Sequence, residues 1–189
     1  IGYSRHKRFM KILDAVICPC PSSADNLMVE HLLGNKFDTM QEMVKFMKET
    51  KVRDKRYTSL HLFSKLCVRG YEPPQTFNKR YARKCILKAF EEVEFAHLRV
   101  CPETTFFNYS WLLIVLLREN KLGFLTKYVK NLRCPNRKKF YTKLLERVRH
   151  GDTLAEVAVR ASTTHIQSSV LLDDPVEHHV QSRPATMNY

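Results

Sequence analysis

The chain has 189 residues, of which 44% are hydrophobic and only five are glycine, so it is long enough for one domain with a packed core. Only two of its 32 lysines and arginines follow residue 150, against five of its 19 aspartates and glutamates. Residues 1–150 therefore carry a net charge of +16. Such a charge favours polyanionic partners, with nucleic acid first and acidic membrane surfaces second.

Cysteine usage and hydropathy exclude two further classes of protein. The six cysteines are widely spaced and mostly lie within apolar helical patterns, unlike those of a small disulfide-rich scaffold. No secretory signal is evident, so we expect reduced thiols and an intracellular protein. The most apolar run, residues 106–117, is shorter than the about 20 residues that a membrane-spanning helix needs.

Helical periodicity runs through residues 1–150 and predicts an all-α bundle of about seven helices. Capping and stop signals separate the segments, including a Thr39–Glu42 capping box. A methionine stripe that begins at Met40 is interpreted as core packing rather than as a ligand set. The segments expected to be helical are 3–16, 23–33, 40–48, 57–68, 77–98, 104–117, 122–132 and a last helix that starts at Pro135. Residues 151–189 are Ser-, Thr-, His- and Pro-rich with little periodicity, so they are predicted to be a flexible tail.

The stretch 101–117 is expected to lie at the centre of the bundle, because from residue 106 onward nearly every helical face is apolar. Pro102 ends the preceding helix, and Thr104 or Thr105 is the predicted cap of the next one. Within the structural motif Phe107-Asn108-Tyr109, Asn108 is expected to be buried. A buried amide needs hydrogen-bond partners, so Asn108 is either a staple between helices, which we favour, or part of a site.

Neither metal binding nor catalysis is indicated. Cys18-x-Cys20 with His31 has poor spacing for zinc, so no metal or other cofactor is expected in this chain. Cys101 and His97 are one helical turn apart, but no orienting third group or oxyanion site accompanies them. The sequence also lacks a glycine-rich phosphate loop. We therefore predict a protein that is not an enzyme.

Two basic runs on predicted helices are the candidate nucleic-acid contacts. Either run alone is typical of a solvated helix face, but two of them in a strongly basic domain favour phosphate binding. Tyr81 and Phe140 are expected on the inner faces of these helices. The candidate residues are Lys79, Arg80, Arg83, Lys84 and Lys88 in the first run, and Arg137, Lys138, Lys139 and Lys143 in the second.

Residues 3–148 resemble the viral late transcription factor 3 family of poxviruses and other large nucleocytoplasmic DNA viruses. The order and spacing of several segments carry the resemblance. Two features depart from the family pattern: Val16-Ile17 stands where the family has Gln-Gly, and Leu144-Leu145 stands where it has a Trp. The matching segments are Tyr3-x-Arg5-x-x-Arg8-Phe9-x-x-x-Leu13, Pro73-Pro74 with the long helix that follows, Cys101-Pro102 with Phe107-Asn108-Tyr109-Ser110, and the basic segment 132–139.

The resemblance implies a transcription factor that helps a viral RNA polymerase start at late promoters, in the host nucleus or in a cytoplasmic viral factory. Its implied partners are DNA and the polymerase or other transcription factors. By analogy it also implies a cyclin-box-like helical bundle. Family members carry an N-terminal zinc ribbon, which in this chain would precede Ile1.

Three alternatives remain open at this stage. The first is a protein-interaction module whose basic faces meet an acidic partner. The second is an enzyme that uses Cys101 and His97. The third is a membrane-surface protein, which is the weakest, since no exposed apolar edge accompanies the basic faces.

Overall fold

The structure is a computed structural model that describes residues 4–21, 23–52 and 54–151. The described residues belong to one compact unit, which ends at Gly151. The predicted tail lies outside the described residues from residue 152 onward.

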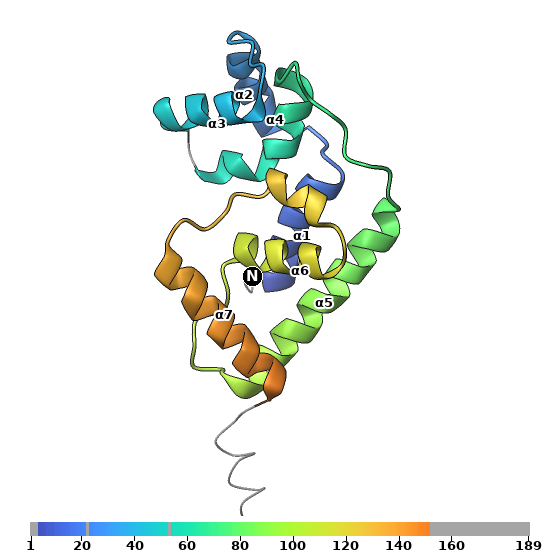
Figure 1. The fold of residues 1–189 in the computed structure, drawn as a ribbon, viewed down its shortest axis with the longest axis vertical. Coiled ribbons are helices and arrows are strands. Elements are labelled where there is room, and N and C mark those ends of the chain that lie inside the picture. The colour runs from blue at the N-terminus through green and yellow to red at the C-terminus, as the bar shows by residue number, and fades with distance from the viewer. Residues whose placement is uncertain (1–3, 22, 53, 152–189) are drawn as a thin grey trace, which may run out of the picture. The chain divides into compact units, whose positions relative to one another are not determined.

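Within the described residues the chain forms seven α-helices, two 3-10 helices and no strand, so the all-α prediction is confirmed (Figure 1). An isolated bridge joins Phe37 and Val68. The elements are α1 (Arg5–Ile17), α2 (Ser23–Leu33), α3 (Met40–Glu49), η1 (Asp54–Ser59), α4 (Leu60–Cys67), α5 (Lys79–Val100), α6 (Tyr109–Glu119), η2 (Gly123–Tyr128) and α7 (Pro135–His150).

Two of the predicted helices are not continuous α-helices. The segment 57–68 is part 3-10 helix and part α-helix, and 122–132 contains only the six-residue 3-10 helix η2. Thr126 donates its hydroxyl proton to the Gly123 carbonyl at 2.7 Å, and the Val129 N–H bonds the Thr126 carbonyl. The backbone bond from Val129 spans three positions, as in a 3-10 helix, whereas an α-helix needs bonds that span four. The chain then runs without helix from residue 129 to the start of α7.

The larger hydrophobic core gathers α1, α5, α6, η2 and α7. Phe9 of α1 stacks on Phe90 of α5 with ring centroids 4.1 Å apart. In α6, Leu112, Leu113 and Leu117 have no exposed surface, which confirms that the apolar stretch lies at the centre of the bundle. Burial of each such side chain stabilises the fold by about 1.5–3 kcal/mol.

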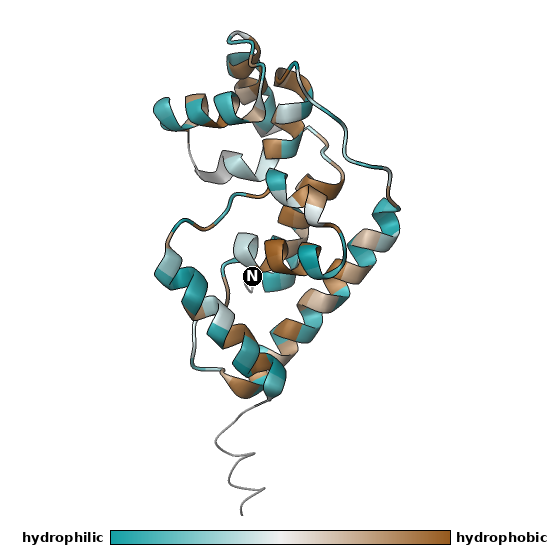
Figure 2. Ribbon diagram, in the orientation of Figure 1, coloured by the Kyte–Doolittle hydropathy of each residue, from teal (hydrophilic) through white to brown (hydrophobic). Residues whose placement is uncertain are grey.

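A smaller core gathers α2, α3, η1 and α4. Met43 and Met47 are fully buried there, so the methionine stripe does serve as core packing. The Thr39–Glu42 capping box is present at the start of α3. Outside the two cores, Figure 2 shows that α3 and the start of α7 are largely hydrophilic on the side in view.

His61 of α4 connects the smaller core to the larger one. Its Nδ1 lies 2.6 Å from the Val16 carbonyl oxygen and its Nε2 lies 3.0 Å from the Tyr71 hydroxyl. Because a carbonyl only accepts, Nδ1 carries the proton of the neutral ring. The ring also stacks on Tyr128 of η2 at 3.9 Å. Burial, with a smaller effect of nearby lysines, lowers the pKa of His61, so the buried ring is stable in its neutral form.

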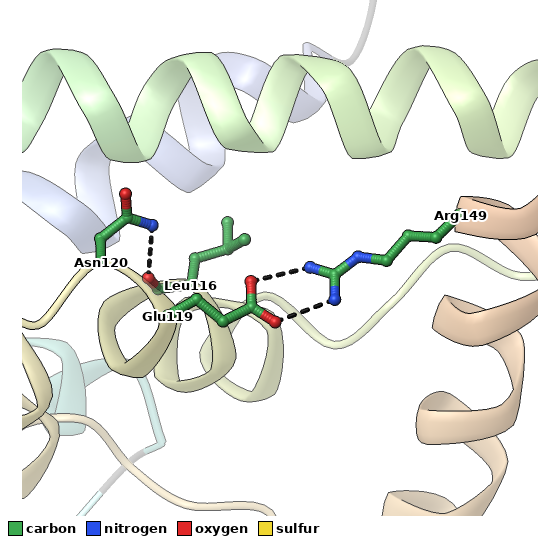
Figure 3. Close-up of polar contacts among 4 residues, drawn as sticks. All are labelled: Leu116, Glu119, Asn120 and Arg149. Carbon is green, nitrogen blue, oxygen red and sulfur yellow. Dashed lines mark hydrogen bonds and ion pairs between the residues drawn. The ribbon is translucent and has the colours of Figure 1, made fainter.

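Two bidentate ion pairs tie neighbouring helices together. Arg149 of α7 donates to both carboxylate oxygens of Glu119 in α6, at 2.9 and 2.7 Å (Figure 3). Arg83 of α5 donates to both oxygens of Asp14 in α1, at 2.6 and 3.2 Å. Each pair fixes one helix against another through parallel N–H···O bonds, which adds geometric specificity.

Candidate nucleic-acid interface

The motif Phe107-Asn108-Tyr109 marks the start of α6, and the prediction of a buried Asn108 is wrong. Phe107 is buried and stacks on Trp111. Asn108 is exposed and is the N-cap of α6, where its Oδ1 accepts the Trp111 N–H at 3.0 Å. An amide at an N-cap satisfies an unpaired backbone donor from outside the helix, so it needs no burial. The prediction that Thr104 or Thr105 caps this helix is also wrong, because Asn108 is the N-cap.

A groove of about 1100 Å³ opens beside this N-terminus. Its walls come from α1, the end of α3, η1, the start of α6 and the segment 129–134 that leads into α7. We call it the basic groove. The residues lining it are Arg8, Lys11, Ile12, Lys48, Val52, Tyr57, Thr58, Asn108, Tyr109, Ser110, Lys130, Asn131, Leu132 and Arg133.

A second hollow of about 400 Å³ adjoins the basic groove and shares five lining residues with it. We call it the side pocket. One wall of the side pocket comes from α3. The other walls come from η1, the first residue of α4 and the chain from the end of η2 onward. The residues lining it are Met40, Gln41, Val44, Lys48, Tyr57, Leu60, Lys127, Val129, Lys130, Asn131 and Arg133.

The charge of this double hollow is entirely positive. No aspartate or glutamate is among the described residues that line it. Concave surfaces lined by one sign of charge focus the electric field and concentrate counter-ions. The six lining cations are Arg8, Lys11, Lys48, Lys127, Lys130 and Arg133.

Aromatic rings hold two of these cations in place. The Lys130 ammonium lies 4.5 Å from the centroid of the Tyr57 ring, and the Arg8 guanidinium lies 5.5 Å from that of Tyr109. A ring face attracts a cation without neutralising its charge. Both cations are therefore oriented at the groove by contact with an aromatic ring.

The α6 N-terminus adds a fixed partial positive charge to one end of the basic groove. Asn108, Tyr109 and Ser110, which line the groove, are the N-cap and the first residues of this helix. The helix dipole favours anions at such a terminus. It reinforces the neighbouring Arg8 and Lys11 of α1.

The predicted basic runs lie outside the groove, since none of their residues is in its lining. Figure 1 shows α5 and α7 meeting near their C-terminal ends, whereas their N-terminal halves, which carry the runs, lie apart. The structure therefore does not bring the two runs together. The exposed members are Lys79, Arg80, Lys84, Lys88, Arg137, Lys139 and Lys143, and Lys138 is partly buried.

Two residues of the first run have carboxylate neighbours. Arg83 is engaged with Asp14, which also raises the pKa of its guanidinium. The Lys88 ammonium lies 4.0 Å from Glu92 one turn along α5. Arg83 is thus a structural residue that ties α5 to α1.

The interior positions predicted for Tyr81 and Phe140 are wrong. Their side chains are 68% and 51% exposed. The buried stripe of α5 runs through Ala82, Ile86 and Phe90, which turns Tyr81 to solvent. Phe140 lies one turn before the buried stripe of α7, which begins at Leu144.

The Cys101–His97 pair lies in the interior of the larger core. Neither side chain has exposed surface. His97 Nε2 lies 3.0 Å from the Thr104 hydroxyl, while Nδ1 is buried without a partner among the described residues. The rings of Phe106 and Phe107 pack against the imidazole in edge-on geometry, with centroids 5.1 and 5.8 Å away. Burial, followed by the charge of Arg5, lowers the pKa of His97.

The described residues contain no group of three or more His, Cys, Asp or Glu that could hold a metal ion. Cys18 and Cys20 are exposed, and the His31 ring packs against Phe46 instead. In the same part of the chain, no helix combines the length and the apolar character needed to cross a membrane.

Fold and site together define an all-α domain with a strongly basic, concave surface. No family model, curated protein or solved structure matches the chain.

The groove was not predicted from the sequence, because its cations come from four separate segments. A partial signal does exist. Arg8 and Lys11 are spaced by three residues on the polar face of α1, and so are Lys127, Lys130 and Arg133 around the end of η2. Neither set stands out from an ordinary solvated face until the fold brings them together.

Proposed function

We propose that the protein binds nucleic acid through the basic groove, without catalysis. The observation that carries the proposal is the convergence of six cations on one hollow that no carboxylate lines among the described residues. Lysines and arginines that neutralise phosphates release condensed counter-ions, which is the main source of sequence-independent affinity for nucleic acid. The resemblance to viral late transcription factor 3 supports a specific role at late promoters, together with a viral RNA polymerase.

The test is the salt dependence of binding to a labelled nucleic acid. Each phosphate contact contributes about 0.9 to the slope of log affinity against log salt, so six contacts give a slope of about −5 on duplex DNA. A variant with Lys48, Lys130 and Arg133 replaced by glutamine should lose about half of this slope. A matched control replaces Lys79, Arg80 and Lys84, which removes the same charge from outside the groove.

The control should bind nearly as tightly as the unchanged protein. Equal losses in both variants would show that net charge, not the groove, attracts the nucleic acid. A flat salt dependence, or no binding at about 50 mM salt, would rule out direct phosphate contact.

A second function is favoured by the outer surfaces of α5 and α7. Exposed Tyr81 lies among the basic residues of α5, and exposed Phe140 lies among those of α7. Aromatic and arginine side chains are typical anchors of protein interfaces. We propose that these surfaces contact an acidic partner protein. A transcription factor would need such a surface to bind polymerase. Replacement of Tyr81 and Phe140 by serine should abolish capture of polymerase and leave nucleic-acid affinity unchanged.

A further inference from the structure

The side pocket differs in chemistry from the basic groove beside it. Its floor is apolar, because Leu60 and Val129 are buried and Met40 and Val44 are partly buried around it. A volume of about 400 Å³ falls within the about 300–1,000 Å³ range of small-molecule sites. A hollow that served only phosphates would have no use for an apolar floor.

Polar groups stand at the mouth of the side pocket. Gln41 and Asn131 contribute exposed carboxamides, each of which presents both donors and acceptors. Lys48, Lys130 and Arg133 line the pocket and the groove alike, so they stand where the two hollows meet. The pocket thus offers apolar walls to a flat ring, amides to its edge and cations to the charged chain that carries it.

We infer that the side pocket receives an unpaired nucleobase while the basic groove holds the adjoining phosphates. This inference rests on the proposed function and specifies its substrate as single-stranded nucleic acid. A base buried among apolar side chains and hydrogen-bonded along its edge is the general way in which proteins hold an extruded nucleotide. Glutamine and asparagine are well suited to such an edge.

The preference for a single strand follows from the energy of unstacking. A base in a duplex must be unpaired and unstacked before it can enter a pocket, which costs a few kcal/mol. A single strand is largely free of that cost. An acidic peptide with apolar residues would also match the charge and the floor. Its carboxylates only accept hydrogen bonds, however, whereas the edge of a base presents donors and acceptors together, as the carboxamides of Gln41 and Asn131 do.

The experiment measures fluorescence anisotropy with three labelled probes of about 20 nucleotides at one salt concentration: a single strand, a duplex and a fully abasic strand. The variant Val44→Trp fills the pocket without a change of charge, and Leu27→Trp is a control on the exposed face of α2. Gln41→Ala is a second pocket variant at an exposed position that leaves the core intact.

The unchanged protein should bind the intact strand about tenfold more tightly than the abasic strand, as expected from about 1–3 kcal/mol for a held base. Val44→Trp should lose this advantage, and Gln41→Ala should lose part of it. Neither variant should alter affinity for the duplex or the abasic strand, and Leu27→Trp should alter nothing.

Three results would overturn the inference while the proposed function stands: equal affinity for intact and abasic strands, no effect of either pocket variant, or the same loss on all three probes. Displacement of the intact strand by an alternating Asp-Leu peptide, with the displacement lost in Val44→Trp, would assign the pocket to a protein partner instead. Absence of binding to all three probes at about 50 mM salt would refute the proposed function itself.

Discussion

The Lys130 ammonium lies over the Tyr57 ring, 4.5 Å from its centroid, where the basic groove and the side pocket meet. Tyr57 belongs to η1, and Lys130 belongs to the segment that follows η2. The contact therefore joins two of the segments that form the hollow. Attraction to the ring face also holds the lysine where it lines both hollows.

Lys130 should consequently be a direct phosphate contact. Lys130→Ala is expected to lower the magnitude of the salt slope by about 0.9 and to weaken binding about equally for all sequences. Lys79→Ala, which removes the same charge from the start of α5, should leave the slope unchanged. The measurement is a salt titration of duplex binding for the three proteins. Equal slopes for Lys130→Ala and the unchanged protein would exclude the lysine from the interface.

Arg83 should affect stability and not binding. Its pair with Asp14 is about two-fifths exposed on each side, so solvent weakens it and Arg83→Met is expected to cost about 0.5–1 kcal/mol. Lys84→Met removes the same charge beside it and should leave stability unchanged. Urea denaturation measures the stability, and anisotropy measures nucleic-acid affinity. A loss of affinity as large as that of Lys130→Ala would show that Arg83 does contact phosphate.

The helices of this protein could be predicted from local pattern, because the apolar residues that form each buried stripe lie at helical spacing within a single segment. The apolar run of α6 led directly to its central position, and the spacing of Thr39 and Glu42 predicted the cap of α3. Errors came where a tertiary or capping relationship overrode periodicity. Asn108 was taken as buried because its neighbours are apolar, whereas the chain before α6 is not helical and leaves the amide at the N-cap.

The groove could not be predicted for a different reason. From the sequence, a basic surface can be recognised only where lysines and arginines are dense within one segment, as they are at the start of α5. The basic groove instead collects one or two cations from each of several segments. Its formation depends on how the smaller core sits on the larger one, through contacts such as His61 with Val16, which are far apart in the sequence.

Asn108 joins the helix cap to the groove, and its substitutions should separate the two roles. Asn108→Ala is expected to destabilise the fold by about 1 kcal/mol, since the Trp111 N–H loses its acceptor. Asn108→Asp keeps the cap and places a carboxylate in the groove lining, so stability should be retained while nucleic-acid affinity falls several-fold. Asn108→Ser should preserve both. Unchanged affinity in Asn108→Asp would place the nucleic acid away from the α6 N-terminus.

Thiol reactivity distinguishes a binding protein from a Cys/His enzyme. Cys18, Cys20 and Cys134 are exposed and should react with an alkylating reagent at ordinary rates. Cys101 is fully buried and should react only when the protein is unfolded in urea. Mass spectrometry of a time course identifies each site. Reaction of Cys101 before Cys18 in the native protein would support the enzyme alternative.

The buried His97 predicts a loss of stability in acid. Burial lowers its pKa below the ordinary value of about 6.5, so as pH falls the unfolded chain takes up a proton before the folded protein does. The stabilisation is therefore complete above about pH 6.5 and is lost as pH falls through the folded pKa. The loss is at most about 1.4 kcal/mol per pH unit for one histidine, and His61, whose pKa is lowered in the same direction, adds to it. In urea denaturation, His97→Leu should retain stability at about pH 7.5 within about 1 kcal/mol, because it also removes the unpartnered Nδ1. The variant should lose less stability on acidification, because it has no imidazole at this position to take up a proton. A variant as acid-sensitive as the unchanged protein would show that His97 does not stay neutral in the folded state.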